Sequence, residues 1–413
     1  MGSQLGSRGE LTTKCPVVAE NNFIPIIKPL MGEPEAQAAR RPILSGWVTQ
    51  GPEVAAFEKE FGAFTGAPFA AAVSNCTTAL HLALLALGVG PGDEAITVSH
   101  SYIATANAIR YCGGMPVFVD IEPVTYNLNP DLLEAAITGR TRAILIVHQI
   151  GMPSNLEAIL PIARRHGVPV IEDAACAIGS EILWEGNWEK IGKPHGDIAC
   201  FSFHPRKVIT TGDGGMLTTA NPEYDRKFRL WRQHGMSVSD VVRHNSSRVT
   251  FERYTELGYN YRMTDIQAAV GREQLKRLSA IVARRRELAA RYHQLFAGLP
   301  GVRVPAEPAY ARSNWQSYSL RLPNNCDQTA VMQYLLDRGI ATRRGIMCSH
   351  REPAYQGGQF RAAGALTESE AAQDRTIILP LFHQMTAEEQ DRVAASLAAA
   401  IAAVVTQAVP SAE

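Results

Sequence analysis

The sequence predicts an α/β protein with a three-layer large domain, in which helices cover both faces of a mostly parallel seven-stranded sheet, and a smaller C-terminal α/β domain. The first observation behind this prediction is the alternation of short apolar runs with helical patterns between residues 70 and 220. The second is a change after residue 263 to one long helical pattern, followed by a shorter mixture of strand and helix patterns. A chain of 413 residues suits two or three domains.

Short β-branched or apolar runs mark the strands of the predicted sheet. They are residues 70–74, 95–98, 115–119, 143–148, 168–172, 198–202 and 215–219. Helical patterns at 77–88, 104–113 and 155–167 lie between them and end at glycine, the residue expected just beyond a helix. The last two strands are too close in sequence for a helical crossover, so we expect one antiparallel edge there.

The pattern divides the chain into four expected segments. They are a flexible N-terminal arm (1–22), a large domain (23–262), a connecting helix (263–296) and a small C-terminal domain (297–413). The small domain is predicted from a strand at 317–322, a helix at 329–340 and a closing helix from about 386. The alanine-rich run at 393–409 falls short of the ~20 apolar residues that span a membrane, so we expect a surface helix.

Composition excludes several classes of protein. Forty Lys and Arg balance forty Asp and Glu, so nothing indicates a nucleic-acid or membrane partner. Seven cysteines without a CxxC pair argue against a disulfide framework and a zinc ribbon, and we expect no metal site. The N-terminus lacks the apolar core of a signal peptide. A cytoplasmic protein is the expectation.

Two charged residues follow strands of the predicted sheet. Lys207, in FSFHPRKVITTGDGG, comes after the strand at 198–202, at the sheet edge where open α/β sheets bind ligands. A solvated surface amine is the alternative to a nucleophilic one. Asp173 ends a buried strand, and two roles are open: an N-cap of the next helix, or a carboxylate that keeps the pyridinium of pyridoxal phosphate protonated.

Three further motifs add polar and aromatic groups. Thr77 and Thr78 stand at a predicted helix start, where hydroxyls and free N–H groups can hold a phosphate, although simple capping explains them nearly as well. Tyr102 follows a strand and could cover a planar cofactor or be an ordinary core residue. Asn260 and Arg262, in GYNYRM, are placed for polar contacts at a turn entering a helix. Only in combination do these groups meet the needs of one vitamin-B6 cofactor.

Longer motifs occur in order along residues 24–396. They are IPIIKPLMGEPE, SGWVTQGPEVAAFEKEF, GVGPGDEAITVSHSYIATANAI, GGMPVFVDIEPVTYNLNP and LPLFHQMTAEEQDRV. In these motifs the sequence resembles the DegT/DnrJ/EryC1/StrS family of sugar aminotransferases, which have the aspartate-aminotransferase-like fold of the pyridoxal-phosphate enzymes known as fold type I.

The resemblance implies that the chain uses pyridoxal 5′-phosphate, with pyridoxamine 5′-phosphate in the half-reaction. It implies that Lys207 bonds covalently to the cofactor, that Asp173 pairs with the pyridine nitrogen and that Tyr102 stacks on the ring. The residues it places on the phosphate are Thr77, Thr78 and Ser202. Family members are usually homodimers with active sites at the interface, so Asn260 is expected to reach the neighbouring subunit's phosphate.

Two cysteines depart from the family pattern. Cys76 stands where the family often has Gly, and Cys176 where it has Gln, His or Glu, near the cofactor; we expect Cys176 to be a packing residue rather than a nucleophile. By family position, the candidate substrate contacts are Trp47, His148, Arg262 and His350. Trp184 and Trp188, in a predicted polar loop, are candidates to stack on a base or sugar.

The implied function is amino transfer, with L-glutamate as the expected donor and a nucleotide-linked keto sugar as acceptor, in amino-sugar biosynthesis. SFHPRKVITTGDGG favours C4 of the hexose over C3. Lys207 would act as general base and acid, for which we expect a lowered pKa. The alternatives are a sugar dehydratase, an aminocyclitol-forming aminotransferase and a non-catalytic regulatory or binding protein. Dehydratase relatives have histidine at the lysine position, so Lys207 argues against that alternative.

Overall fold

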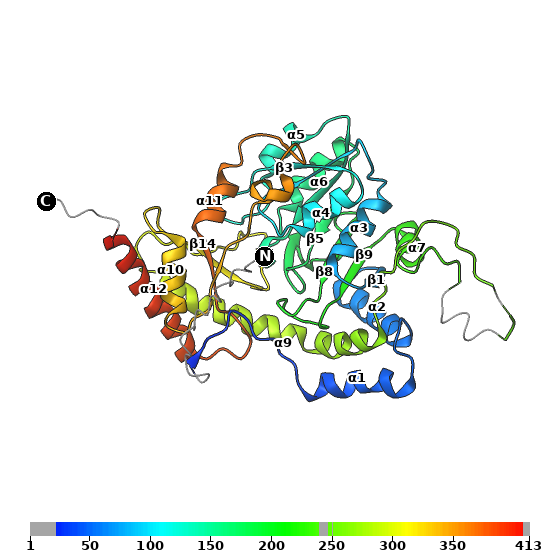
Figure 1. The fold of residues 1–413 in the computed structure, drawn as a ribbon, viewed down its shortest axis with the longest axis horizontal. Coiled ribbons are helices and arrows are strands. Elements are labelled where there is room, and N and C mark those ends of the chain that lie inside the picture. Colours follow the sequence, from blue (N-terminus) through cyan, green and yellow to red (C-terminus); the bar gives the residue numbers. More distant parts are fainter. Residues whose placement is uncertain (1–21, 239–246, 250, 408–413) are drawn as a thin grey trace, which may run out of the picture.

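The computed structural model describes residues 22–238, 247–249 and 251–407, so nearly all of the expected N-terminal arm lies outside the described residues. Its largest sheet has eight strands in the order β1-β9-β8-β5-β4-β2-β3-β13 (Figure 1). The strands are β1 (Phe69–Val73), β2 (Glu94–Val98), β3 (Met115–Val119), β4 (Thr141–Val147), β5 (Val170–Asp173), β8 (Ile198–Ser202), β9 (Gly215–Thr219) and β13 (Arg361–Ala362). All seven predicted strands are present, and β13 adds an eighth from the C-terminal part of the chain.

Strand directions confirm a mostly parallel sheet. The pairs from β13 to β8 are parallel, whereas β9 runs antiparallel to both of its neighbours. The expected antiparallel pairing of β8 with β9 is therefore confirmed. Its expected place at the sheet edge is wrong, because β1 pairs with β9 over its whole length, from Phe69 opposite Thr219 to Val73 opposite Gly215.

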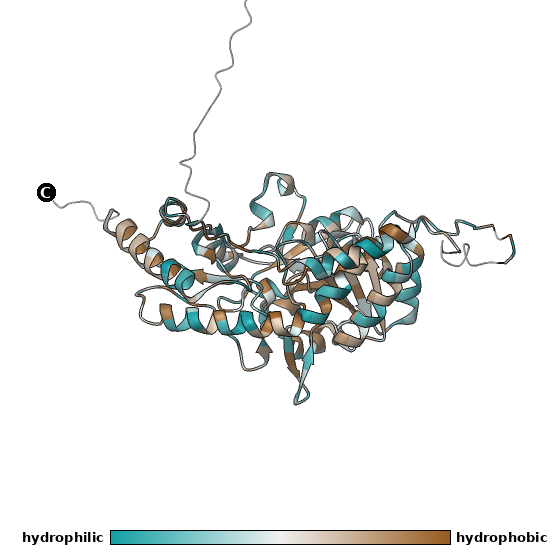
Figure 2. Ribbon diagram, turned by 90° about the horizontal axis from the view of Figure 1, so that it is seen from below, coloured by the Kyte–Doolittle hydropathy of each residue, from teal (hydrophilic) through white to brown (hydrophobic). Residues whose placement is uncertain are grey.

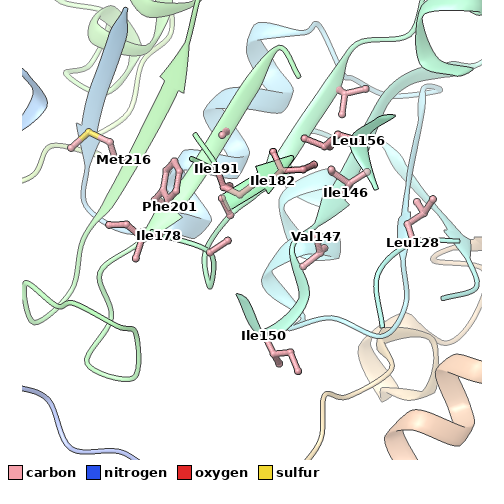
Figure 3. Close-up of a cluster of buried hydrophobic side chains, with 14 of the residues drawn as sticks. Leu128, Ile146, Val147, Ile150, Leu156, Ile178, Ile182, Ile191, Phe201 and Met216 are labelled. Atoms are coloured by element: carbon pink, nitrogen blue, oxygen red, sulfur yellow. The ribbon is translucent and has the colours of Figure 1, made fainter. Parts of the chain in front are cut away.

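Helices cover both faces of this sheet. They are α2 (Pro52–Thr65), α5 (Leu133–Ala136), α6 (Leu156–Arg165) and α9 (Asp265–Phe296) on one face, and α3 (Cys76–Ala86), α4 (Ala104–Tyr111) and α7 (Pro222–Trp231) on the other. Side chains alternate along a strand, so on β4 Ile146 packs on the first face and Leu145 on the second. Figure 3 shows Ile146 with Leu156, Phe201 and Met216 in the first core.

The predicted helices end as their sequences indicate. A glycine at positive φ follows the last turn of α4 and α6: Gly113 has φ +82° and Gly167 φ +65°. At the other end of α3, the side chain of Asn75 accepts a hydrogen bond from the Thr78 N–H at 2.9 Å and closes a capping box. This cap fixes where α3 begins relative to the carboxyl end of β1.

A second core forms around the C-terminal half of α9. It contains a three-stranded sheet in the order β11-β14-β12 and two helices. These elements are β11 (Tyr318–Arg321), β12 (Arg343–Arg344), β14 (Thr376–Leu379), α10 (Gln328–Leu336) and α12 (Ala387–Gln407). The short helix α11 (Thr367–Arg375) precedes β14. The separate core is compatible with the expected small domain, whose boundaries remain a prediction.

Helix α9 connects the two cores (Figure 1). In its second half, the buried guanidinium of Arg285 donates hydrogen bonds to the carbonyls of Trp315, Gln316 and Leu381, at 2.6–3.1 Å. Burial lowers the pKa of Arg285 to about 10, because no anionic partner among the described residues offsets it. The arginine thus attaches the second core to the helix through backbone oxygens.

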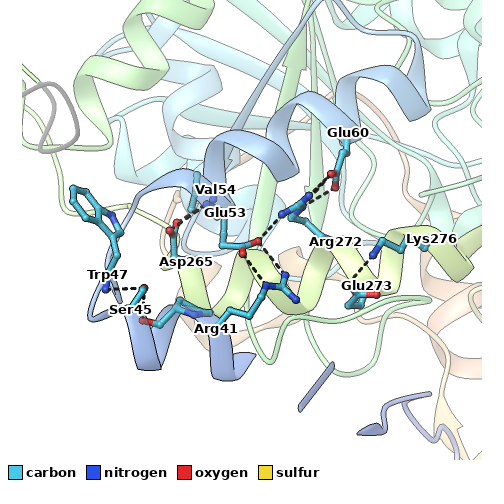
Figure 4. A network of polar contacts seen from close by, with 11 residues as sticks. Arg41, Ser45, Trp47, Glu53, Val54, Glu60, Asp265, Arg272, Glu273 and Lys276 are labelled. Carbon is cyan, nitrogen blue, oxygen red and sulfur yellow. Dashed lines mark hydrogen bonds and ion pairs between the residues drawn. The ribbon is translucent and has the colours of Figure 1, made fainter. Parts of the chain in front are cut away.

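The start of α9 is bound to α2 and to the turn between α1 (Glu33–Ser45) and α2, where the Asp265 N–H donates to the Thr49 carbonyl at 3.0 Å. The carboxylate of Asp265 accepts N–H bonds from Gly51 at 2.7 Å and Val54 at 3.0 Å, at the start of α2. Arg272 bridges Glu53 and Glu60 on α2 (Figure 4). The indole N–H of Trp47, in the turn between α1 and α2, donates to the Gln50 carbonyl at 3.2 Å.

The predicted polar loop around the two tryptophans is wrong, because it forms a hairpin. Strands β6 (Glu181–Trp184) and β7 (Asn187–Lys190) pair with each other, and β10 (Ala311–Arg312) adds to β6. The ring centroids of Trp184 and His195 are 4.9 Å apart, and the guanidinium carbon of Arg312 lies 3.8 Å from the ring centroid of Trp188. Both indoles therefore have protein partners.

Hydrophilic and hydrophobic residues alternate along the outer helices (Figure 2). Most of the alanine-rich run at 393–409 belongs to α12, whose Val393, Leu397 and Ala400 pack into the second core. Over the described part of the chain, no helix has the length and apolar character of a membrane span.

Candidate active site

A cavity of about 500 Å³ lies at the carboxyl ends of β4, β5 and β8. The start of α3 forms one wall, and β12 and β14 of the second core contribute to another. Seven of the predicted site residues line it: Thr77, Thr78, Tyr102, Asp173, Cys176, Ser202 and Lys207. They come from four connections that follow different strands, as the sequence predicted for a site at this edge.

Lys207 lies in a turn that follows β8. Its N–H donates to the His204 carbonyl at 2.8 Å, and its partly buried Nζ donates to the Sγ of Cys176 at 3.1 Å. Burial lowers the pKa of Lys207, but Cys176, Cys76 and Asp173 together raise it further, so the pKa lies above its ordinary value. The prediction of a lowered pKa for Lys207 is therefore wrong when only the groups of the protein act on it.

Asp173 is buried at the end of β5, beside the cavity. Oδ2 accepts the hydroxyl hydrogen of Thr105 at 2.8 Å, and Oδ1 accepts the Ala175 N–H at 3.1 Å. Burial raises the pKa of Asp173, and these bonds and Lys207 offset only part of that effect. A carboxylate has about four acceptor positions, so Asp173 can accept a further hydrogen bond from a cationic N–H group within the cavity.

The start of α3 offers an anion-binding wall. The described residues provide no acceptor for the N–H groups of Cys76 and Thr77 in its first turn. Gly215 lets β9 approach this turn, since a Cβ there would lie 2.5 Å from the carbonyl carbon of Asn75. Ser202, at the end of β8, adds a hydroxyl on the same cavity.

Tyr102 lines the cavity from the connection between β2 and α4. Its side chain is 63% exposed in the single chain, so the predicted core alternative is wrong for this tyrosine. An exposed ring at a cavity mouth is available to stack on a planar ligand.

Five predicted contacts lie outside the cavity lining: Asn260, Arg262, Trp47, His148 and His350. His148 is fully buried; its Nδ1 accepts the Ser154 N–H at 2.9 Å, so Nε2 carries the hydrogen that it shares with Glu172 at 2.9 Å. His350 pairs with Ser99 and Glu370. In the single chain, these two histidines have structural partners rather than open faces toward the cavity.

The sequence analysis missed several cavity residues. Thr105 fixes Asp173, and its signal was a second hydroxyl three residues after Tyr102. Arg206 lies one residue before the lysine, and Arg343 comes from β12, more than 130 residues later. Both residues line the cavity, and neither guanidinium group has a hydrogen-bonding or ionic partner among the described residues. No short sequence motif predicts that Arg343 lies at the cavity.

Comparison with known proteins gives a consistent result. A model of the DegT/DnrJ/EryC1/StrS aminotransferase family matches residues 29–398. The chain is 39% identical over 381 residues to the spore coat polysaccharide biosynthesis protein SpsC of Bacillus subtilis, covering 91% of this chain and 97% of the relative.

Solved structures agree over nearly the whole chain. The aminotransferase TlmJ of Streptoalloteichus hindustanus is 34% identical, with a TM-score of 0.83 over 92% of this chain and 99% of that one. A putative sugar aminotransferase of Streptococcus pneumoniae in its pyridoxamine-phosphate form is 27% identical, with a TM-score of 0.85 over 92% and 99% of the two chains.

Proposed function

Because the chain belongs to the DegT/DnrJ/EryC1/StrS aminotransferase family, we propose that it transfers an amino group from L-glutamate to a nucleotide-linked keto sugar. The chain is a pyridoxal-phosphate-dependent transferase of the sugar aminotransferase family. The finer proposal concerns its substrates and the role of each site residue. One observation carries it: Lys207 and Asp173 share a cavity with the open first turn of α3.

The residues of the cavity fit pyridoxal phosphate. Lys207 supplies the amine for the aldehyde, Asp173 has an acceptor position for the pyridinium N–H, and Tyr102 offers a ring face. The groups proposed to hold the phosphate are the first-turn N–H groups of α3, Thr77, Thr78 and Ser202. Bound there, the cofactor would supply an electron sink for the carbanion formed at the donor's α-carbon.

The chain's own groups would then handle the protons. The free Nζ of Lys207 takes the proton from the donor's α-carbon and later returns one to the product side, so one amine serves as base and acid. Asp173 stays ionised by accepting the pyridinium N–H, which offsets the cost of its burial. The connection bearing Tyr102 and the second core line the cavity beside these groups.

Two cationic groups support an anionic substrate. Arg206 and Arg343 line the cavity, and guanidinium groups bind both carboxylates and diphosphates in a bidentate manner. We assign them to the donor's carboxylate and the diphosphate of the nucleotide sugar. The motif SFHPRKVITTGDGG supports amination at C4 of the hexose.

A homodimer is part of the proposal. Large apolar side chains are exposed on α1 and at the cavity mouth, with Ile43 at 55%, Leu44 at 67% and Tyr102 at 63%. We propose that a second copy covers these side chains and that, as the family resemblance implies, Asn260 of the partner subunit reaches the phosphate. The proposed compartment is the cytoplasm, in keeping with the six described cysteines, all free thiols.

The test is spectroscopic and chemical. Purified protein should be yellow, borohydride should fix the cofactor on Lys207 in peptide mass spectra, and L-glutamate should bleach the colour. Lys207→Ala should lower turnover by about a thousandfold or more. Incubation with UDP-, GDP- and dTDP-linked 4-keto and 3-keto sugars, read as a mass shift, identifies the acceptor. Near-native turnover of Lys207→Ala, or cofactor that never bonds to the lysine, would contradict the proposal.

A further inference from the structure

Cys176 contacts the amine of Lys207. Its Sγ lies 3.1 Å from Nζ, within hydrogen-bonding distance for sulfur, and both side chains line the cavity. The contact joins the turn after β5 to the turn after β8. It brings an ionisable thiol against the one amine on which the proposed function depends.

The backbone around Cys176 holds this sulfur in place. The Cys176 carbonyl accepts a hydrogen bond from Nδ2 of the buried Asn314 at 2.8 Å, and the same Nδ2 also donates to the Ile178 carbonyl at 2.8 Å. One residue earlier, the Ala175 N–H is bound to Asp173. The turn is therefore fixed on both sides of the cysteine.

Cys176 differs from the other described cysteines. Five of the six are buried, whereas Cys176 is partly exposed. Burial raises the pKa of Cys76, which also lines the cavity, and of Cys200 well above the ordinary range. Among the described cysteines, Cys176 alone combines access to the cavity with a contact to a cation.

We propose that Cys176 is a positioning residue for Lys207: whenever the amine is not bonded to the cofactor, the sulfur accepts a hydrogen bond from Nζ and stabilises its protonated form. The inference rests on the proposed role of Lys207 as the cofactor-linked lysine. The proton on Nζ comes from the donor's α-carbon and leaves again to the product side, so the sulfur takes part without gaining or losing a covalent bond.

The electrostatics of the cavity agree with this geometry. The pKa of Lys207 is raised despite burial, and Cys176 is the largest of the groups that raise it, ahead of Cys76 and Asp173. Other charged or titratable groups on the same cavity are His204 and Arg206 on the turn of the lysine, Asp213 on the following loop, Tyr102 before α4 and Arg343 on β12. Arg206 opposes a second positive charge, so an adjacent acceptor matters for holding the protonated lysine.

The first test measures the thiol. The holoenzyme in its pyridoxamine form leaves the lysine amine free, and iodoacetamide is added across pH 6–9, with alkylation of Cys176 followed by peptide mass spectrometry. Contact with the Nζ ammonium should activate the sulfur toward alkylation, so Lys207→Met should slow alkylation at pH 7 by about fivefold or more. Lys207→Arg, which keeps the charge, should stay within about twofold. N-acetylcysteine in the same tube is the reference thiol.

The second test measures the amine. Only the unprotonated amine reacts with trinitrobenzenesulfonate, so the midpoint of Lys207 labelling against pH reports its protonation. Cys176→Ala should move this midpoint to lower pH and speed labelling at pH 8 by about threefold, whereas Cys326→Ser, remote from the cavity, should leave it unchanged. The midpoint, and not the plateau rate, is decisive, because removing the side chain also widens access.

The outcomes separate the two levels of inference. Equal alkylation in wild type and Lys207→Met, with cofactor still bound, overturns the role of Cys176 and leaves the aminotransferase proposal intact. An unchanged labelling midpoint in Cys176→Ala does the same. Failure of borohydride to fix the cofactor on Lys207 in the wild type instead overturns the proposed function.

Discussion

The hydroxyl of Thr105 donates a 2.8 Å hydrogen bond to Oδ2 of Asp173 and thereby ties the first turn of α4 to the end of β5. Ser101 Oγ lies 2.8 Å from the same hydroxyl and completes a short chain of buried polar groups. The carboxylate that is proposed to face the pyridine nitrogen is thus oriented from behind by a residue outside its own motif.

Replacing Thr105 should weaken cofactor binding. Thr105→Val keeps the shape but removes the donor, so the pKa of Asp173 rises further and pyridoxal phosphate should dissociate about tenfold more readily, as measured by equilibrium dialysis. Thr105→Ser keeps the hydroxyl and should stay within about threefold of wild type. Equal affinity in the valine and serine variants would contradict the positioning role.

Asp173→Asn should stabilise the protein without cofactor while it impairs function. The pKa of Asp173 is raised in the folded protein. Its protonated form therefore contributes fully to the free energy of folding below the unfolded-state pKa of about 3.9, and this contribution is lost as pH rises through the folded-state pKa. At pH 7 the apoprotein variant should therefore gain about 1 kcal/mol in urea unfolding, with little gain at pH 4. Its half-reaction with glutamate should slow by about a hundredfold or more. A less stable apoprotein at pH 7 would refute this account.

Arg343→Ala should act on substrate binding alone. Loss of the guanidinium group should raise the KM of an anionic substrate about tenfold with kcat within about twofold, in steady-state assays. The neighbouring Arg344 is a matched control, because it pairs with Glu352 at 3.4 Å, and Arg344→Ala should leave both constants unchanged. Loss of cofactor from Arg343→Ala would instead show that this arginine supports the structure of the cavity rather than substrate binding.

Gly215→Ala should disturb the proposed phosphate-binding wall at the start of α3. The new Cβ would meet the backbone of Asn75 at 2.5 Å, so β9 and the start of α3 must separate, with an expected cost of about 1–3 kcal/mol in unfolding and a lower affinity for pyridoxal phosphate. Gly90→Ala, where nothing lies within 4 Å of the added carbon, is the control. Unfolding curves and cofactor titration of both variants measure the effect.

Local chemistry explains what could be predicted from the sequence. The strands around Lys207 and Asp173 are continuous apolar runs with a polar residue at the carboxyl end, and both residues line the cavity where a parallel sheet requires them. The cap at Asn75 and the glycines beyond α4 and α6 follow from short-range rules as well.

Features that depend on distant partners could not be predicted in this way. The place of β9 inside the sheet is set by its pairing with β1, about 150 residues earlier in the chain. Arg343 reaches the cavity because β12 pairs with β14. The motif containing Trp184 and Trp188 was too polar to suggest strands, yet its hairpin is completed by β10 and the stacked Arg312.

The 32-residue helix α9 has a consequence for how new substrates can be accommodated. At the N-terminal end of the helix, the carboxylate of Asp265 accepts N–H bonds from the start of α2. In its C-terminal half, Arg285 donates hydrogen bonds to three carbonyls of the second core. The second core, which contributes Gln316 and Leu381 to the cavity, is thus attached to the same helix that is bound to α2 of the large domain, so widening the cavity for a larger sugar by moving the second core would require breaking these contacts. We therefore expect that a change of sugar substrate on this fold requires the exchange of individual side chains that line the cavity, while the backbone and the lysine stay the same.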